Sequence, residues 1–118
     1  MVKIFLLDDS HSSLRQNEKI FKSLGARVSK ADNGNEALSL LKKEPFDLVL
    51  CDLLMSGDNG FTVIKKIKEN STSTKIMVLS TDIQEETRKK TQEMGVVNYF
   101  NKPLNNEKAQ EIINGVKV

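Results

Sequence analysis

Short apolar segments alternate along the chain with longer segments of helical periodicity. Five of them have strand length: residues 2–7, 27–31, 48–51, 76–79 and 96–100. After four of them, apolar residues recur three and four positions apart, and after residues 76–79 oppositely charged residues recur four apart, so five helices are predicted. Residues 48–51 and 76–79 are apolar throughout, as is typical of strands buried on both faces, whereas residues 27–31 alternate like an exposed edge strand. This order predicts an α/β fold with a parallel sheet covered by helices on both faces.

Turn and capping residues separate these elements. Ser10 is suited to cap the first helix, and Gly25 to end it. Asn33 opens a turn with the pattern of a capping box before the second helix. Asp58 is expected to cap the third helix rather than to bind metal. The fourth helix, residues 84–94, is mostly polar, so we expect it to pack weakly.

Composition narrows the class of protein without naming a function. A chain of 118 residues fits one domain, residues 1–118, and no apolar run approaches the roughly 20 residues of a membrane span. The N-terminal apolar segment is too short for a signal peptide, so a cytoplasmic protein is expected. A net charge of +2 is too small to indicate nucleic-acid binding. The single cysteine, Cys51, is expected to be a small buried apolar residue rather than a redox centre.

Polar side chains gather where the predicted strands end. The residues are Asp8 and Asp9, Asp52, Ser80 and Thr81, and Lys102. In open parallel sheets, ligands bind outside the carboxyl ends of the strands, so these side chains are expected to share one pocket. Asp52 ends the central strand, where a buried carboxylate is costly unless it has partners.

The residue types in this pocket suggest a cation and a phosphoryl group. Neighbouring carboxylates repel one another unless a cation lies between them. Oxygen ligands without a histidine or thiol cluster favour a hard cation, Mg²⁺ or Mn²⁺. A metal, a lysine and a hydroxyl around one carboxylate are what phosphoryl transfer to that carboxylate requires.

With these residues in this order, the sequence resembles the receiver domain of bacterial-type two-component response regulators over essentially its whole length. The resemblance implies a flavodoxin-like, CheY-like fold, in which a five-stranded parallel sheet of order 2-1-3-4-5 is combined with five helices. Because the sequence stops after the fifth helix, it most resembles stand-alone CheY-type regulators, which act in two-component and chemotaxis signalling.

The resemblance also implies roles around the acidic residues. Asp52 is the expected phosphoacceptor. Asp9, Asp52 and the backbone carbonyl of Leu54 are expected to bind Mg²⁺, with Asp8 acting mainly through a water. The expected protein is a phosphoacceptor rather than an enzyme, beyond self-phosphorylation and slow autodephosphorylation.

Further roles fall on the last two strands. Ser80 and Lys102 are expected to hold the phosphoryl oxygens, and the Lys102–Pro103 bond is expected to be cis. Tyr99 matches the family's switch aromatic, which turns inward when the hydroxyl residue moves to the phosphoryl group; plain packing against the sheet is the alternative. Thr81 stands where the family often has alanine or glycine, so it is expected to hinder the hydroxyl shift or the inward turn.

Partners are implied in the same way. A sensor histidine kinase is the expected phosphodonor, and a downstream protein is expected to dock on the fourth helix, fifth strand and fifth helix of a monomer or weak dimer. Asn98, Asn101 and Leu104 do not match the surface that binds the flagellar motor switch in well-known chemotaxis members. Ser56 replaces a proline that is frequent in the family, which predicts a less rigid loop.

Other interpretations remain open. The pair Asp8 and Asp9 could simply cap the first helix, and His11 could relay phosphate, although a solvated histidine is favoured. A degenerate receiver, acting as a constitutive protein-binding module or a phosphate sink, is the main functional alternative. A phosphohydrolase with an aspartyl nucleophile ranks last, because Leu54 occupies the position where such enzymes often carry a second aspartate.

Overall fold

The computed structural model of the chain describes residues 1–71 and 73–117. The described residues form a parallel sheet with the order β2-β1-β3-β6-β7, which confirms the predicted order 2-1-3-4-5. Its strands are β1 (Lys3–Leu7), β2 (Arg27–Ala31), β3 (Leu48–Cys51), β6 (Lys75–Ser80) and β7 (Asn98–Asn101). The inner strands are almost wholly buried, as their apolar runs predict, and β2 lies at an edge with mostly part-exposed side chains.

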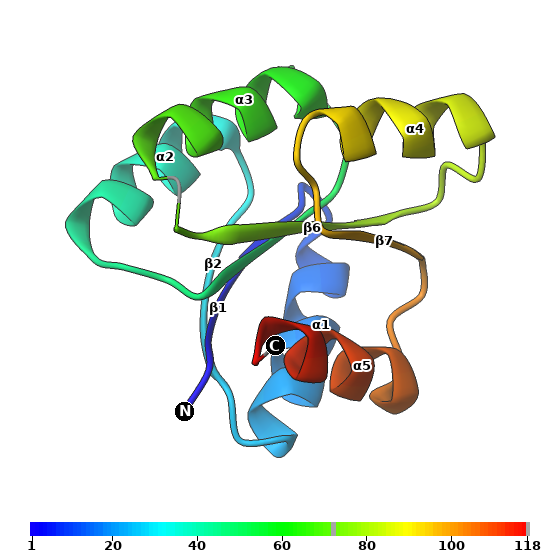
Figure 1. The fold of residues 1–118 in the computed structure, drawn as a ribbon. Helices are drawn as coiled ribbons and strands as arrows, with labels where there is room; N and C mark the ends of the chain where they lie inside the picture. The colour runs from blue at the N-terminus through cyan, green and yellow to red at the C-terminus, as the bar shows by residue number, and fades with distance from the viewer. Residues whose placement is uncertain (72, 118) are drawn as a thin grey trace.

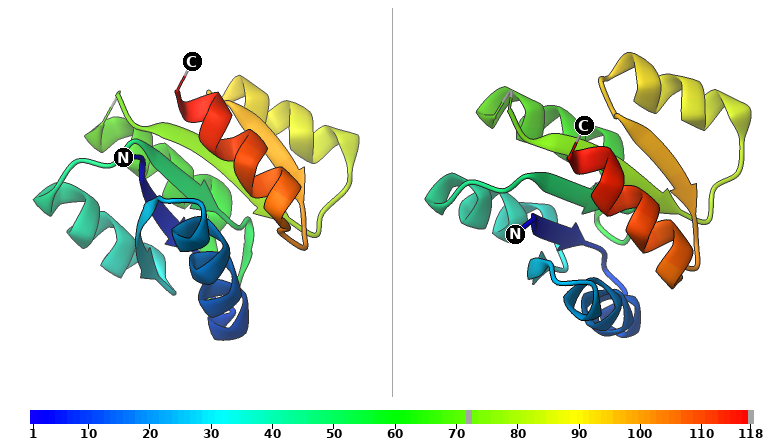
Figure 2. Two further views of the ribbon diagram at one scale, coloured as in Figure 1. Left: turned by 90° about the horizontal axis from the view of Figure 1, so that it is seen from below. Right: turned by 60° about the horizontal axis from the view of Figure 1, so that its bottom comes forward.

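Helices cover both faces of the sheet. They are α1 (His11–Ser23), α2 (Gly34–Lys43), α3 (Gly60–Asn70), α4 (Glu85–Glu93) and α5 (Asn106–Val116). Figure 1 shows α2, α3 and α4 on one face and α1 and α5 on the other, and Figure 2 turns this second face toward the viewer. Each face has its own apolar core. No helix in the described part of the chain is both long enough and apolar enough to cross a membrane.

The predicted caps of the first two helices are confirmed. The side chains of Ser10 and Asn33 each accept a hydrogen bond from the backbone N–H three residues later. These bonds satisfy N–H groups that have no partner within the helix, so they fix where α1 and α2 begin. Because α1 begins at His11, the preceding Asp8 and Asp9 stay at the mouth of the sheet.

The predicted cap of the third helix is wrong. Asn59, not Asp58, caps α3, through a hydrogen bond of 3.0 Å from the N–H of Phe61 to its side-chain oxygen. The Asp58 carboxylate instead accepts the N–H of Gly34 at 3.1 Å, which ties this loop to the start of α2. The helix begins one residue later than predicted because a short antiparallel ribbon precedes it.

This ribbon consists of β4 (Leu54–Met55) and β5 (Asp58–Asn59), which pair antiparallel directly after Asp52. Gly57 turns the chain between them with a φ of +77°, a conformation that side chains disfavour. Two-residue strands are too short to show a periodic pattern, so the sequence did not predict them.

Two further predictions concern the edge near α4. The fifth strand was expected at residues 96–100 but forms at Asn98–Asn101, so its polar end lies in the sheet. Thr91 is the only buried residue of α4, which confirms the prediction that this helix packs weakly. The structure therefore places a mostly solvent-facing helix beside the edge strand β7.

Candidate functional site

The register of the sheet brings the polar strand ends together. In the parallel pair β1 and β3, Leu7 lies opposite Cys51, so Asp8 and Asp52 leave the sheet side by side. The backbone N–H of Asp52 still donates to the carbonyl of Leu7 at 3.0 Å. On the other side of β3, the strands β6 and β7 end in step, which brings in Ser80 and Lys102.

Three carboxylates meet at this edge. One oxygen each from Asp8, Asp9 and Asp52 lies within 4.8 Å of the others. Asp8 is 5% and Asp52 6% exposed, whereas Asp9 is only partly buried. Buried like charges at such distances need a cation, and an all-oxygen set of this kind suits Mg²⁺ or Mn²⁺. The donor set therefore fits the metal that the sequence predicts.

Lys102 supplies a fixed positive charge among these carboxylates. Its Nζ donates to Asp8 at 2.7 Å and to Asp52 at 2.9 Å. Burial alone would lower the pKa of Lys102, but the hydrogen bonds and charges of Asp8 and Asp52 outweigh burial and raise it. The Lys102–Pro103 bond is cis, as the resemblance implies.

The chain after Asp52 folds back over its carboxylate. The N–H of Leu54 donates to Asp52 Oδ1 at 3.0 Å. This bond leaves the second oxygen of Asp52 to Lys102 and sets the direction of the side chain. Leu54 is 55% exposed.

Ser56 has a contact that a proline would lack. Its backbone N–H donates to Asp9 Oδ2 at 2.7 Å. Proline has no N–H, so this bond exists because of the substitution that was expected to loosen the loop. That expectation is not supported, since the loop is tied to one of the three carboxylates.

The switch candidates lie at the end of β6 and on β7. Ser80 is fully buried, and its hydroxyl accepts the N–H of Asp82 at 3.3 Å. Tyr99 is 7% exposed and turned inward, and its hydroxyl donates to the carbonyl of Asp82 at 2.7 Å. Burial raises the pKa of the Tyr99 phenol, while the nearby Ser80 hydroxyl opposes the shift. Thr81 is exposed and does not keep the Tyr99 ring out in this structure, whereas its expected hindrance of the Ser80 hydroxyl shift stays a prediction.

Arg88 of α4 contacts the ring of Tyr99. Its guanidinium lies 4.8 Å from the centre of the ring and donates to the side-chain oxygen of Asn101 at 3.1 Å. Sequence reasoning missed Arg88 because its partners lie on a different element, and nothing local in the polar helix distinguishes it from its charged neighbours.

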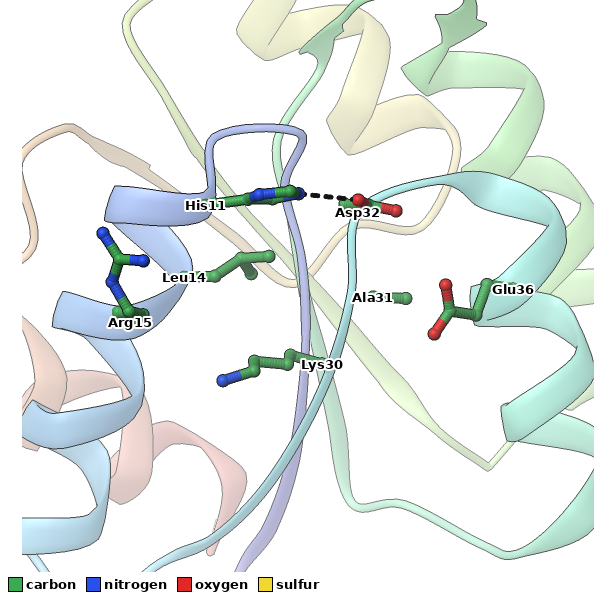
Figure 3. Close-up of a pocket in the computed structure, with 7 residues that line it drawn as sticks. All are labelled: His11, Leu14, Arg15, Lys30, Ala31, Asp32 and Glu36. Atoms are coloured by element: carbon green, nitrogen blue, oxygen red, sulfur yellow. Dashed lines mark hydrogen bonds and ion pairs between the residues drawn. The ribbon is translucent and has the colours of Figure 1, made fainter.

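His11 stands apart from the carboxylates. Its Nε2 lies 2.7 Å from Asp32 at the rim of a cavity of about 370 Å³ between α1 and β2, drawn in Figure 3. The hydrogen bond from His11 is the main reason that the pKa of Asp32 is lowered. The His11 side chain is 71% exposed, which fits the favoured interpretation of a solvated residue.

Cys51 lies in the core directly before Asp52. It is fully buried, and burial raises the pKa of its thiol. A thiol kept protonated and away from solvent is a poor nucleophile, in agreement with a packing role.

Comparison with known proteins identifies a family that shares this fold. A family model described as response regulator receiver domain matches residues 4–114. PilH of Pseudomonas aeruginosa is 29% identical over 118 residues and covers 98% of both chains. The two-component response regulator ARR22 of Arabidopsis thaliana is 33% identical, with 96% of this chain and 82% of ARR22 covered.

Longer proteins and a solved structure match as well. The transcriptional regulatory protein ZraR of Klebsiella oxytoca is 31% identical, and the chain spans only 25% of its length. The structure of the chemotaxis protein CheY4 of Vibrio cholerae superposes with a TM-score of 0.91 at 27% identity, covering 98% of both chains. With a family model covering nearly its whole length, the chain belongs to the response regulator receiver domains.

Proposed function

We propose that this chain is a phosphorylation-activated signalling switch of a two-component or chemotaxis pathway. A carboxylate oxygen of Asp52 attacks the phosphorus of a phosphohistidine on a sensor kinase. The new oxygen–phosphorus bond forms as the phosphorus–nitrogen bond to the donor breaks, and the imidazole leaves. The observation that carries this proposal is the charge pattern, in which one lysine contacts two of three clustered carboxylates.

The surrounding residues are given the roles that the family resemblance implies. Asp9, Asp52 and the carbonyl of Leu54 would hold Mg²⁺, and Asp8 would act through a water. A bound Mg²⁺ neutralises the oxygens of the carboxylates and of the transferring group. Lys102, whose Nζ lies 2.9 Å from Asp52 Oδ2, would hold a phosphoryl oxygen.

Ser80 and Tyr99 connect this chemistry to the outer surface. When the Ser80 hydroxyl turns to a phosphoryl oxygen, it leaves its place beside Asp82, whose carbonyl holds Tyr99. Tyr99 also contacts Arg88, and these residues join β7 to α4. The surface formed by α4, β7 and α5 is therefore where a downstream protein docks.

Phosphorylation in the presence of Mg²⁺ tests the proposal. Incubation with acetyl phosphate should add one acid-labile phosphoryl group, detected by intact mass, to the wild-type protein. Asp52→Asn should take up none, because an amide oxygen is a far weaker nucleophile than a carboxylate. Asp47→Asn is the matched control, since Asp47 is exposed and bonded to the Lys3 backbone instead. Normal labelling of Asp52→Asn would refute the assignment.

A second candidate is a constitutive binding module of the degenerate-receiver type. The inward position of Tyr99 favours it, because Asp82 and Arg88 hold the ring through contacts outside the acidic cluster. Beryllofluoride with Mg²⁺ separates the two candidates. Shifted amide resonances around both Asp52 and Tyr99 support the switch, whereas shifts confined to Asp52 support the constitutive module.

A further inference from the structure

Asp9 differs from the other two carboxylates in how its side chain is held. Asp8 and Asp52 each accept a backbone N–H from two residues later and also the ammonium of Lys102. In the described part of the chain, only Ser56 forms a hydrogen bond or ion pair with the Asp9 side chain, through its backbone N–H at 2.7 Å. The direction of the Asp9 carboxylate therefore depends on one donor, 47 positions away in the sequence.

The turn of the ribbon leaves the Ser56 N–H free for this bond. Met55 pairs with Asp58, so Ser56 and Gly57 are the two central residues of the turn. Gly57 has a φ of +77°, and no residue other than glycine has a positive φ in the described chain. A negative φ followed by a positive one is typical of a type II turn, whose hydrogen bond joins its first and fourth residues and whose second residue is commonly proline. The turn itself makes no use of the Ser56 N–H, which donates to Asp9 instead.

This bond holds the Asp9 carboxylate in a position that electrostatic repulsion opposes. One oxygen of Asp9 lies within 4.8 Å of oxygens of Asp8 and Asp52, although Asp9 is only partly buried and has solvent beside it. Like charges at this distance repel one another. A hydrogen bond from a backbone N–H to a carboxylate is charge-assisted and therefore counteracts the repulsion. It takes one of about four lone pairs of the carboxylate, so the others stay available to a cation.

We propose that the Ser56 N–H is a positioning group for the cation site, because it keeps the Asp9 carboxylate turned toward Asp8 and Asp52 before a cation binds. This inference rests on the proposed function, in which Asp9 would hold Mg²⁺ directly. Fixing a ligand in advance removes part of the cost of binding. Partners that orient metal ligands are typically worth about 10- to 100-fold in affinity. A proline at residue 56 would lack this support, because it has no N–H.

The hydrogen bond itself is tested in metal-free protein. Ser56→Pro removes the N–H and suits the second position of the turn, whereas Ser56→Ala keeps the N–H. Both variants are made in wild-type protein and in Asp9→Ala, and urea unfolding gives the ratio of the folding equilibrium constant of the proline variant to that of the alanine variant. The ratio should be about 3- to 10-fold lower when Asp9 is present, since the proline then costs a hydrogen bond. Effects of proline on the unfolded chain cancel between the two backgrounds.

The positioning role is tested by calorimetric titration with Mg²⁺. Ser56→Pro should bind Mg²⁺ about 10-fold more weakly than Ser56→Ala, which is the matched control because it differs from serine only in the side chain. If residue 56 only shapes the turn, the two variants should bind Mg²⁺ equally, since both residues are compatible with the turn.

The outcomes separate the claims. Equal folding ratios in the two backgrounds overturn the hydrogen bond between Ser56 and Asp9, and with it the proposal. Equal Mg²⁺ affinities of Ser56→Pro and Ser56→Ala overturn the positioning role and leave the proposed function in place. If wild-type protein binds no Mg²⁺, the proposed function and the positioning role fail together, while the unfolding comparison still decides the hydrogen bond.

Discussion

Replacing Gly60 with alanine should displace the backbone that follows Asp52. Gly60 begins α3, and a Cβ placed there would lie 2.6 Å from the Cα of Leu53 and 2.8 Å from its carbonyl oxygen. Both are backbone atoms, so no side-chain rotation relieves the contact. The chain at Leu53 or the start of α3 must move by about 0.8 Å to reach the 3.4 Å of an ordinary contact.

Two effects of opposite sign set the size of the loss. Alanine favours a helix interior over glycine by roughly 1 kcal/mol, and gains less than that at a first helical position such as residue 60. An extra methyl group in a packed site costs about 1 to 3 kcal/mol. The free energy of unfolding should therefore fall by about 1 to 2 kcal/mol, or roughly 5- to 30-fold in the folding equilibrium.

Urea unfolding followed by circular dichroism measures this loss. Gly115→Ala in α5 is the control, because its new Cβ would meet only the flexible end of Met77, at 3.2 Å. That variant should be as stable as wild-type protein or slightly more stable. Leu54 follows Leu53 directly, so Gly60→Ala should also weaken Mg²⁺ binding. A Gly60→Ala protein as stable as wild type would refute the reasoning.

Three other predictions follow from single contacts. The folded-state pKa of Lys102 is raised above its ordinary 10.5, so its contribution to stability should be complete below pH 10.5 and be lost as the pH rises through the folded-state pKa. The free energies of unfolding of wild-type protein and Lys102→Met, measured with urea, should therefore converge at alkaline pH. Tyr99→Phe removes the donor to Asp82 and should lower the free energy of unfolding by about 0.5 to 1.5 kcal/mol in the same assay, and an unchanged value would contradict the bond. If Asp9 is a direct ligand, as proposed, Asp9→Asn should weaken Mg²⁺ binding at least about tenfold by calorimetry, because loss of even an outer partner of a metal site has an effect of that size; equal affinity would remove Asp9 from the site.

Much of the fold could be predicted because its signals are local. The apolar runs at residues 48–51 and 76–79 show burial on both faces within a few positions. Ser10 and Asn33 bond to backbone groups three residues away, so their roles can be recognised in the sequence. The strand-end residues could be gathered into one pocket because parallel strands end at the same edge of a sheet.

Other features depend on contacts between distant residues. The bond from Ser56 to Asp9 joins residues 47 positions apart, and the sequence alone suggested a looser loop. Tyr99 lies inward because of Asp82 and Arg88, which belong to the preceding loop and helix. Asn17 is buried on α1 at a position where periodicity predicts an apolar residue, and only the tertiary structure shows that it lies beside Asp8 and Asp52.

The sequence by itself determined the elements, their order and the residue types at the strand ends, because hydrophobic periodicity and capping act over a few residues. Only the tertiary structure decided which lone pairs of Asp8, Asp9 and Asp52 are occupied and by which donors. Hydrogen bonds require atoms to meet within a few tenths of an ångström, and that precision arises from the packing of several elements at once.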